Sequence, residues 1–347
     1  MERDTEIHIP KTRRGGTFTD SKDVKLHAND FEWEAKVDEL SPEERSLVAI
    51  YTSKCLDELA RVEEAAPSWD SVPPRPWESH FASSKHHFPV KNYIVHAFPQ
   101  LRGIVSRDAA PTRVLECGCG TGSTLLPIMR ECTSTNIRFV GFDISPSALE
   151  HFRNSEVAQG YLARKQLTLF PLAIGTPWCS AEADAESPAL KRQRGDGAVT
   201  LVADAIAAAD ATLENELFDA VLLIFVLSAL PTVEKMTVAV RQLKRVMKPD
   251  GVLFFRDYAL PDHNFFRFLA KMDNKVGEVA FAKGDGTTQA FFHKKFAAEL
   301  FASAGLVEVD DSASKLTYHC NRIVNRKNGK RMDKIFINGT FKIATSS

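Results

Sequence analysis

A glycine loop between a strand-like and a helix-like run constrains this chain more than any other stretch of its sequence. Val114 and Leu115 form an apolar lead-in, and glycine then occupies three alternate positions, Gly118, Gly120 and Gly122. An apolar, helix-like run follows over residues 125–129. Glycine permits positive φ and lets a ligand approach the main chain, and the amides that open a helix then face that ligand. The pattern predicts a strand, a ligand-binding loop and a helix.

A second short strand ends in a carboxylate. Residues 139–143 read Phe-Val-Gly-Phe-Asp, and Asp143 lies about twenty residues beyond the loop, where an acid reaches a ribose hydroxyl in dinucleotide-binding folds. The loop itself reads Glu-x-Gly-x-Gly-x-Gly, and Glu116 lies in the strand before it. An acid repels a pyrophosphate but attracts the ammonium of S-adenosylmethionine. The loop therefore resembles motif I of the class I methyltransferases, and a tight β–α turn without a ligand is the alternative.

The rest of the chain alternates strand-like and helix-like runs. Strands are predicted over residues 199–204, 218–225 and 252–258, with an amphipathic helix over 233–246 and an additional strand over 166–174. The alternation predicts an α/β fold with a Rossmann-like, doubly wound and mostly parallel sheet. Ligands of such sheets bind at the carboxyl ends of the strands. The residues predicted at or near those ends are Gly118, Asp143, Asp204, Ile224 and Asp257.

Three segments of different composition make up the chain. Residues 1–40 read as a flexible, basic N-terminal arm, and residues 41–104 as a helical, aromatic-rich N-terminal extension. The α/β domain is expected over residues 105–347. It contains an insert, 175–198, whose small and charged residues predict a mobile surface loop.

Composition excludes several classes of protein. Lys and Arg number 44 and Asp and Glu number 45, so no overall field draws the chain to nucleic acid, and such binding requires local basic patches. The six cysteines lack metal-site spacing and favour a reducing compartment. No apolar run is long enough to span a membrane, and the N-terminus lacks the pattern of a signal or transit peptide. We expect a cytoplasmic or nuclear protein.

An aromatic stretch, residues 77–101, precedes the glycine loop. Trp77 and Phe81 stand one helical turn apart and therefore share a face. Two alternatives fit this spacing: a helix that packs on the domain, or a lid over the ligand pocket. The histidines of the stretch have no acid or cysteine that completes a metal-ligand set, so we expect no bound metal.

The C-terminal part carries a basic cluster. A hairpin is predicted there, with its turn at Asn328-Gly329. A solvated surface turn and a phosphate-binding face are equally consistent with this pattern. The basic residues of the cluster are Arg322, Arg326, Lys327, Lys330, Arg331 and Lys334.

Several runs are more specific than the fold. Residues 223–230, the turn 248–251 and the run Arg256-Asp257-Tyr258 together resemble the methyltransferase-like family that forms 3-methylcytidine in tRNA. Three further runs match this family, and they are Trp77 with residues 98–101, residues 283–287 with Phe291-Phe292, and residues 324–326. The resemblance extends from Trp77 to Ile343, apart from the insert.

The resemblance implies a class I fold, S-adenosylmethionine as methyl donor and a cytidine of the tRNA anticodon loop as acceptor. It also leaves room for an accessory protein partner in tRNA selection. The cofactor contacts that it implies are Trp77, Phe81, Glu116, Gly118, Gly120, Asp143, Asp204, Ala205 and Ile224. The family pattern Phe-x-Lys-Asp-Arg-His-Trp reads Phe-Pro-Val-Lys-Asn-Tyr over residues 88–93 here, so Lys91 is a candidate for the role of the arginine. The candidate RNA contacts are Lys91, Arg326, Lys327, Lys330 and Arg331.

Methylation of cytosine at N3 sets the chemistry expected on the acceptor side. N3 has a lone pair and no proton, so alignment with the methyl group matters more than a strong base and can supply about 7–11 kcal/mol of the barrier. The product base is a cation, which a carboxylate stabilises. Asp257 is the candidate carboxylate, with Arg256 and Tyr258 as positioning groups. An ion pair with Arg256 or a loop cap is the alternative role of Asp257. The target base must be unpaired or flipped out, and Phe88, Tyr93 and Tyr258 are candidates to stack on it.

Two other functions are alternatives to tRNA methylation. A methyltransferase of a protein or small molecule would keep the cofactor, and the C-terminal basic cluster argues against a small acceptor. A non-catalytic partner protein would keep only the fold. The intact site residues that argue against a non-catalytic protein are Glu116, Gly118, Gly120, Asp143 and Asp204.

Overall fold

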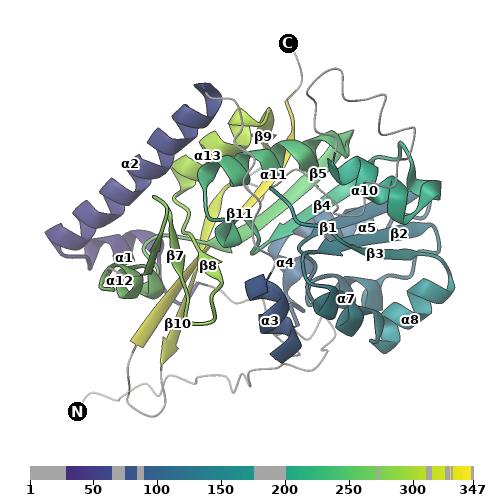
Figure 1. The fold of residues 1–347 in the computed structure, drawn as a ribbon, viewed down its shortest axis with the longest axis horizontal. Coiled ribbons are helices and arrows are strands. Elements are labelled where there is room, and N and C mark those ends of the chain that lie inside the picture. The colour runs from purple at the N-terminus through teal and green to yellow at the C-terminus, as the bar shows by residue number, and fades with distance from the viewer. Residues whose placement is uncertain are drawn as a thin grey trace, which may run out of the picture.

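An eight-stranded sheet runs through the molecule (Figure 1). The computed structural model describes residues 29–64, 75–83, 90–175, 201–271, 274–309, 315–324, 329 and 331–344. The strands of the large sheet are β1 (Thr112–Cys117), β2 (Ile137–Asp143), β3 (Leu167–Pro171), β4 (Phe218–Ile224), β5 (Met247–Tyr258), β9 (Leu306–Glu308), β10 (Thr317–Val324) and β11 (Arg331–Ile343).

The sheet is parallel over most of its width. Its order is β10-β11-β5-β4-β1-β2-β3, with β9 paired to β11. The pairs β3–β2, β2–β1, β1–β4 and β4–β5 are parallel, whereas β11 runs antiparallel to β5, β9 and β10. These pairings confirm the predicted doubly wound, mostly parallel sheet, and β10 and β11 confirm the predicted C-terminal hairpin.

Helices cover both faces of the sheet because side chains of each buried strand alternate between two apolar cores. Val114 and Leu115 of β1, for example, belong to different cores. One face carries α2 (Pro42–Glu64), α10 (Leu201–Ala209), α11 (Val233–Arg245) and α13 (Lys294–Ser303). The other face carries α4 (Ile94–Ala97), α5 (Pro99–Val105), α6 (Leu125–Glu131), α7 (Pro146–Arg153) and α8 (Glu156–Ala163).

The N-terminal segment adds helices to this core. α2 begins as predicted, with a reciprocal cap in which Ser41 Oγ accepts from the Glu44 amide at 3.2 Å and Glu44 accepts from the Ser41 amide at 3.0 Å. The short helix α1 (Trp33–Asp38) precedes α2, and Trp33 stacks on Tyr318 of β10 at 4.6 Å between ring centroids. Since Trp33 Nε1 also donates to the Leu260 carbonyl at 2.8 Å, α1 is fixed to the C-terminal hairpin side of the molecule.

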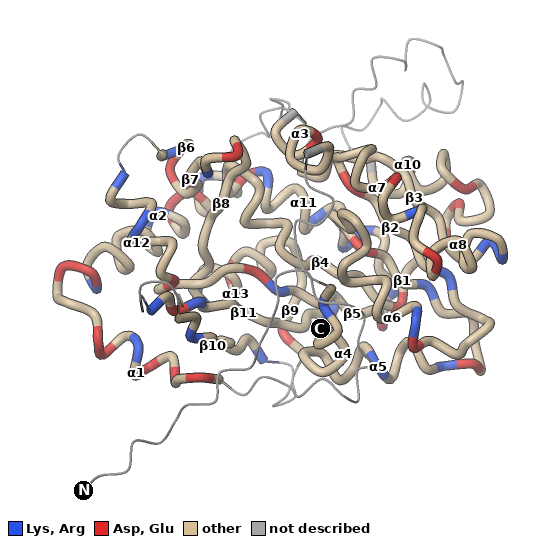
Figure 2. The backbone as a smooth tube through the Cα atoms, turned by 90° about the horizontal axis from the view of Figure 1, so that it is seen from below, with Lys and Arg blue, Asp and Glu red and all other residues tan. Residues whose placement is uncertain are grey.

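Smaller elements complete the described chain. A second, three-stranded sheet consists of β6 (Lys275–Val276), β7 (Ala280–Ala282) and β8 (Thr288–Gln289). The remaining helices are α3 (Arg75–Ser83), α12 (His263–Leu269) and the 3-10 turns η2 (Ala211–Leu213) and η3 (Leu227–Ala229). Figure 2 shows basic and acidic residues interspersed along the described chain. None of the described helices has the length and apolar character that crossing a bilayer requires.

One prediction of secondary structure needs correction. The run predicted as a strand over residues 199–204 begins the helix α10 in its described part, because five alanines in nine residues favour a helix. The additional strand predicted over 166–174 is confirmed as β3 (Leu167–Pro171), the edge strand of the parallel sheet. Apart from Gly175, the predicted insert 175–198 lies outside the described residues.

Candidate active site

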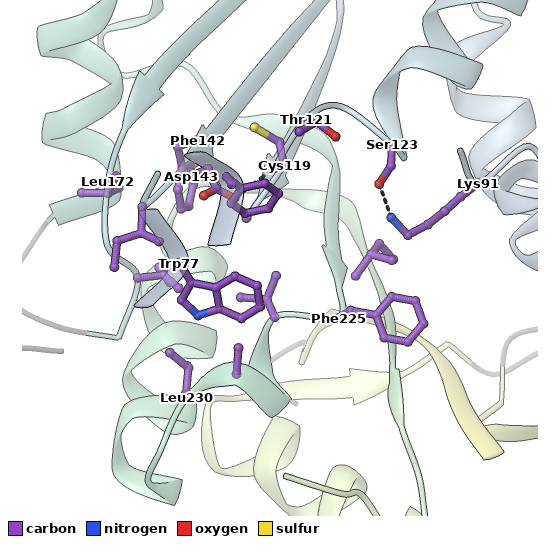
Figure 3. A pocket seen from close by; sticks show the side chains of 18 residues that line it. Trp77, Lys91, Cys119, Thr121, Ser123, Phe142, Asp143, Leu172, Phe225 and Leu230 are labelled. Atoms are coloured by element: carbon purple, nitrogen blue, oxygen red, sulfur yellow. Dashed lines mark hydrogen bonds between the residues drawn. The ribbon is translucent and has the colours of Figure 1, made fainter. Parts of the chain in front are cut away.

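A pocket lies at the carboxyl ends of the parallel strands, where the sequence predicted a ligand. Residues that follow β1, β2, β3 and β4 form its wall, and α3 contributes two aromatic side chains (Figure 3). Six of the nine predicted cofactor contacts line this pocket, and they are Trp77, Phe81, Gly118, Gly120, Asp143 and Ile224.

The glycine loop has the backbone conformation that its sequence predicted. Gly118 and Gly120 both have positive φ, at 64° and 53°. A Cβ added at Gly118 would lie 2.5 Å from Val226 Cγ2, so only glycine fits there. The loop is anchored to the neighbouring strand because the Cys119 amide donates to the Phe142 carbonyl at 3.0 Å.

The Asp143 carboxylate closes the loop from the end of β2. Its Oδ2 accepts from the Gly120 amide at 2.8 Å, and its Oδ1 accepts from the Ser145 amide at 2.9 Å. Burial raises the pKa of Asp143 to about 6, although the Ser145 and Gly120 amides oppose this shift. The carboxylate therefore joins the glycine loop to the start of α7 and also borders the pocket.

Helix α3 lies against the pocket through Trp77 and Phe81, whose rings stack at 6.1 Å between centroids. Glu78 on the same helix accepts from the Ser145 hydroxyl at 2.6 Å and from the Ser147 hydroxyl. These contacts fix α3 to the start of α7. Trp77 and Phe81 therefore form part of the pocket wall, and both the lid and the packing helix remain predictions.

The turn between β7 and β8 holds α3 from another direction. The Lys283 ammonium lies 5.4 Å from the centre of the Trp77 ring, and His80 Nδ1 lies 3.3 Å from an Asp285 carboxylate oxygen. A cation over an aromatic face is attracted by the ring quadrupole. Residues 283–287, which match a motif of the family, therefore form a turn that contacts α3.

Glu116 and Lys91 form a buried pair of opposite charges behind the loop. Glu116 is buried in β1 outside the pocket lining, and burial raises its pKa against the effect of the Lys91 charge. Lys91 lines the pocket with only 5% exposure, and burial lowers its pKa against the effect of Glu116. Its amide donates to the Ser123 carbonyl at 2.7 Å, and its ammonium donates to the Ser123 hydroxyl.

An aromatic cluster borders the pocket at Phe225. The cluster consists of Tyr93, Phe225, Tyr258 and Phe336 around the guanidinium of Arg256. Phe225 adopts a positive φ of 61°, and its ring lies 5.0 Å from Tyr258 and 5.5 Å from Phe336 between centroids. The guanidinium lies 4.6 Å from the Phe336 ring centre and 5.2 Å from that of Tyr93. Arg256 is only 3% exposed, and burial lowers its pKa.

Asp257 has the loop-cap arrangement that the sequence left open as an alternative. Its side chain is fully buried, Oδ2 accepts from the Ser228 amide at 2.9 Å, and Oδ1 accepts from the Tyr258 amide at 2.8 Å. Burial raises its pKa to about 7, against the hydrogen bonds from Ser228. Because Ser228 belongs to η3, Asp257 holds the turn that follows β4 and does not line the pocket.

Asp204 and Ala205 lie apart from the pocket lining. Both belong to α10, and Ala205 is buried in the core. Burial raises the pKa of the Asp204 carboxyl. The pocket wall next to β2 is formed by Leu172 and Ile174, which follow β3. Asp204 was predicted at the end of a strand over 199–204, but it lies in the first turn of the helix α10.

The described part of the C-terminal basic cluster is compensated by acids. The Arg331 guanidinium lies 2.7 Å from Asp333 and 3.0 Å from Glu39. Burial alone would raise the pKa of Asp333, but Arg331, Arg322 and Lys36 lower it to about 2. The predicted RNA contacts Arg326, Lys327 and Lys330 lie outside the described residues.

Sequence reasoning missed several residues of the pocket wall. Phe142, Ile144, Leu172, Ile174 and Phe225 line it and were not predicted as contacts. Each lies at or just beyond the carboxyl end of β2, β3 or β4, and this position next to a strand end is the signal that could have identified them. No three His, Cys, Asp or Glu side chains gather into a candidate metal site in the part of the chain that the structure describes.

Together, the fold and the pocket define a class: α/β proteins that bind a nucleoside ligand at the carboxyl ends of parallel strands. Residues 91–310 match the family model described as a methyltransferase domain. This match covers more than half of the 347 residues, and the chain belongs to that family.

Proteins of known activity show what this chain is similar to. The tRNA(Thr) (cytosine(32)-N(3))-methyltransferase of Saccharomyces cerevisiae is 27% identical over 276 residues, which are 79% of this chain and 38% of that protein. The tRNA N(3)-cytidine methyltransferase METTL6 of Rattus norvegicus is 28% identical over 304 residues, 86% of this chain and 85% of that protein. The O-methyltransferase 3 of Dictyostelium discoideum is 27% identical over 70% of this chain and 46% of that protein. The first two relatives confirm the resemblance that the motifs indicated.

A solved structure confirms the fold class. The SAM-dependent methyltransferase of Anabaena variabilis superposes with a TM-score of 0.50 at 14% identity, over 80% of this chain and 98% of that one. At this identity the likeness establishes the common fold, the mostly parallel sheet with helices on both faces.

Proposed function

We propose that this protein transfers a methyl group from S-adenosylmethionine to N3 of a cytidine in the anticodon loop of a tRNA. Two relatives that span most of this chain carry names of tRNA cytidine-N3 methyltransferases. The observation that carries the proposal is that six motif residues, far apart in the sequence, line one pocket at the carboxyl ends of the strands.

The residues of the pocket fit this donor. Asp143 offers a carboxylate for the two ribose hydroxyls, and Phe142, Leu172 and Ile174 offer apolar contacts for the adenine. Positive φ at Gly118 and Gly120 allows the ligand to approach the main chain closely. When bound, S-adenosylmethionine supplies an activated methyl group on a sulfonium.

The aromatic cluster fits a flipped-out base. Phe225 lies in the pocket wall, and Tyr258 and Phe336 extend from it along β5 and β11. An unpaired base gains about 1–3 kcal/mol from stacking on an aromatic side chain. We assign Tyr258 and Arg256 to positioning of the acceptor base, and the Tyr93 ring lies 5.2 Å from the Arg256 guanidinium.

Cytosine N3 needs no general base, so this site works by alignment and by stabilising charge. The methylated base is a cation, and the faces of the ring cluster attract a cation. Asp257 contributes indirectly, because it holds η3 and thereby the segment from Phe225 to Leu230 that lines the pocket. It is a positioning residue in this proposal.

The partner in this proposal is tRNA, with an accessory protein for tRNA selection as a further element. The expected location is the cytoplasm or nucleus, where tRNA is modified.

O-methylation is the second candidate function, favoured by the similarity to the O-methyltransferase 3 of Dictyostelium discoideum. A hydroxyl acceptor carries a proton that a base must remove. Asp143 is the only carboxylate among the described residues of the pocket lining, and it is hydrogen-bonded to two main-chain amides. The site therefore suits an acceptor without a proton better.

The test is incubation of purified protein with methyl-labelled S-adenosylmethionine and tRNA from cells that lack the protein. Extract of the same cells supplies any accessory partner. Nucleoside mass spectrometry is expected to find label in 3-methylcytidine, and much less with Asp143→Asn protein. Label in a small molecule, a protein or another nucleoside instead would refute the proposal.

A further inference from the structure

Lys91 was predicted to contact RNA, but it is buried in the wall of the donor pocket. Lys91 is 5% exposed. Its main chain and its ammonium are both bonded to Ser123, which follows the glycine loop and also lines the pocket. A phosphate of a folded tRNA remains at the protein surface, where such an amine is out of reach.

The pocket has two polar ends. Asp143 and Leu172 lie on one side, and Lys91 and Ser123 lie on the opposite side (Figure 3). Among the described residues of its lining, Lys91 is the only lysine or arginine and Asp143 is the only acid. The proposed donor has polar groups at both ends, with a ribose diol near one end and an amino-acid group, which has one carboxylate and one ammonium, at the other.

We propose that Lys91, assisted by the Ser123 hydroxyl, binds the carboxylate of the donor's amino-acid end and thereby orients the donor in the pocket. The inference rests on the proposed function. With the ribose at Asp143, the amino-acid chain passes the glycine loop toward Lys91. A charge-assisted hydrogen bond from an ammonium to a carboxylate is about twice as strong as a neutral one.

The charges around Lys91 support this assignment. Glu116 and Arg256 are the charged side chains that act on it, and both are buried. Asp257 in turn acts on Arg256, and Asp143 acts on Glu116. Within the described pocket lining, however, the Lys91 ammonium is the one cationic side chain that a ligand carboxylate can reach.

The test compares two ligands by calorimetry in wild-type and Lys91→Met protein. S-adenosylhomocysteine and 5′-methylthioadenosine share the adenine, the ribose and the sulfur, but only the first has an amino-acid end. Lys91→Met is expected to lower the affinity for S-adenosylhomocysteine by about 10- to 100-fold and to leave the affinity for 5′-methylthioadenosine unchanged. An equal loss for both ligands, or no loss for either, overturns the inference.

Two further variants distinguish a specific effect on binding from a loss of folded structure. Ser123→Ala removes the hydroxyl beside the Lys91 ammonium. It is expected to lower the affinity for S-adenosylhomocysteine but not for 5′-methylthioadenosine, by a smaller factor than Lys91→Met. Lys283→Met is the matched control, because Lys283 contacts the Trp77 ring from outside the described pocket lining. It is expected to change both affinities by the same factor.

The outcomes also separate this inference from the proposed function and from an RNA role. Failure of wild-type protein to bind either nucleoside contradicts the proposed donor itself. Loss of tRNA affinity in Lys91→Met, with S-adenosylhomocysteine affinity intact, would restore Lys91 as an RNA contact and refute the carboxylate site.

Discussion

The Asp143 carboxylate offers the sharpest prediction about donor binding, through the variant Asp143→Asn. The ionised side chain can accept hydrogen bonds from both ribose hydroxyls, each contributing about 1.5–3 kcal/mol as a bond to a charged group. The amide keeps at most one acceptor and no charge. We expect a loss of about 2–3 kcal/mol, which is about 30- to 150-fold in the dissociation constant of S-adenosylhomocysteine.

The same carboxylate makes donor binding depend on pH. Because burial raises the pKa of Asp143 to about 6, the group becomes protonated as pH falls through 6 and then accepts less well. The affinity of the wild-type protein for S-adenosylhomocysteine is expected to fall between pH 7 and pH 5. At pH 5, one unit below the pKa, the loss is about tenfold at most. Asp143→Asn protein has no such titration and should show a flat profile over this range.

Calorimetry at pH 7 and pH 5 measures both effects. Asp210→Asn is the control, because Asp210 binds Thr168, Thr212 and Arg138 outside the described pocket lining. Its affinity for S-adenosylhomocysteine should equal that of the wild type. A wild-type affinity for the ligand in Asp143→Asn protein, or an equal pH dependence in both proteins, would show that Asp143 does not hold the ribose.

Three further substitutions test the glycine loop, the lid and the C-terminal hairpin. Gly118→Ala forces alanine to a φ of 64° against Val226 and should lower the free energy of unfolding in urea by at least about 1–2 kcal/mol; an unchanged midpoint would contradict this. Glu78→Ala removes the acceptor of the Ser145 and Ser147 hydroxyls and should speed donor dissociation in stopped-flow measurements, whereas an unaltered rate would exclude α3 as a lid. Asp333→Asn should lower the free energy of unfolding by about 2 kcal/mol at pH 7, since the pKa near 2 in the folded protein lies below the ordinary aspartate value of 3.8. The loss should be about half as large at pH 3, because the stabilisation from a lowered pKa is present above the unfolded value and is lost as pH falls toward the folded one. The same loss at both pH values would point to packing rather than charge.

The sequence predicted the ligand-binding half of the fold well because its signals are local. Positive φ at Gly118 and Gly120 follows from glycine spacing, and Asp143 follows from a short strand that ends in an acid. Trp77 and Phe81 share a face of α3 because they stand four positions apart. Each of these features depends on neighbours in the chain.

The errors arose where tertiary contacts decide the outcome. Residues 201–209 contain β-branched and alanine side chains that suit either a strand or a helix, and the helix packs on the sheet. Nothing local shows that Lys91 is buried beside Ser123, that Asp257 caps η3, or that Arg331 is paired with Asp333 and Glu39. These contacts join residues that are far apart in the chain, apart from Arg331 and Asp333.

The most direct test of the central claim is nucleoside mass spectrometry of tRNA from cells with and without this protein. The account predicts that 3-methylcytidine falls in specific tRNAs when the protein is removed. It also predicts that the wild-type protein restores the modified base and that Asp143→Asn protein, present at equal abundance, restores far less. Unchanged 3-methylcytidine after removal would contradict the account.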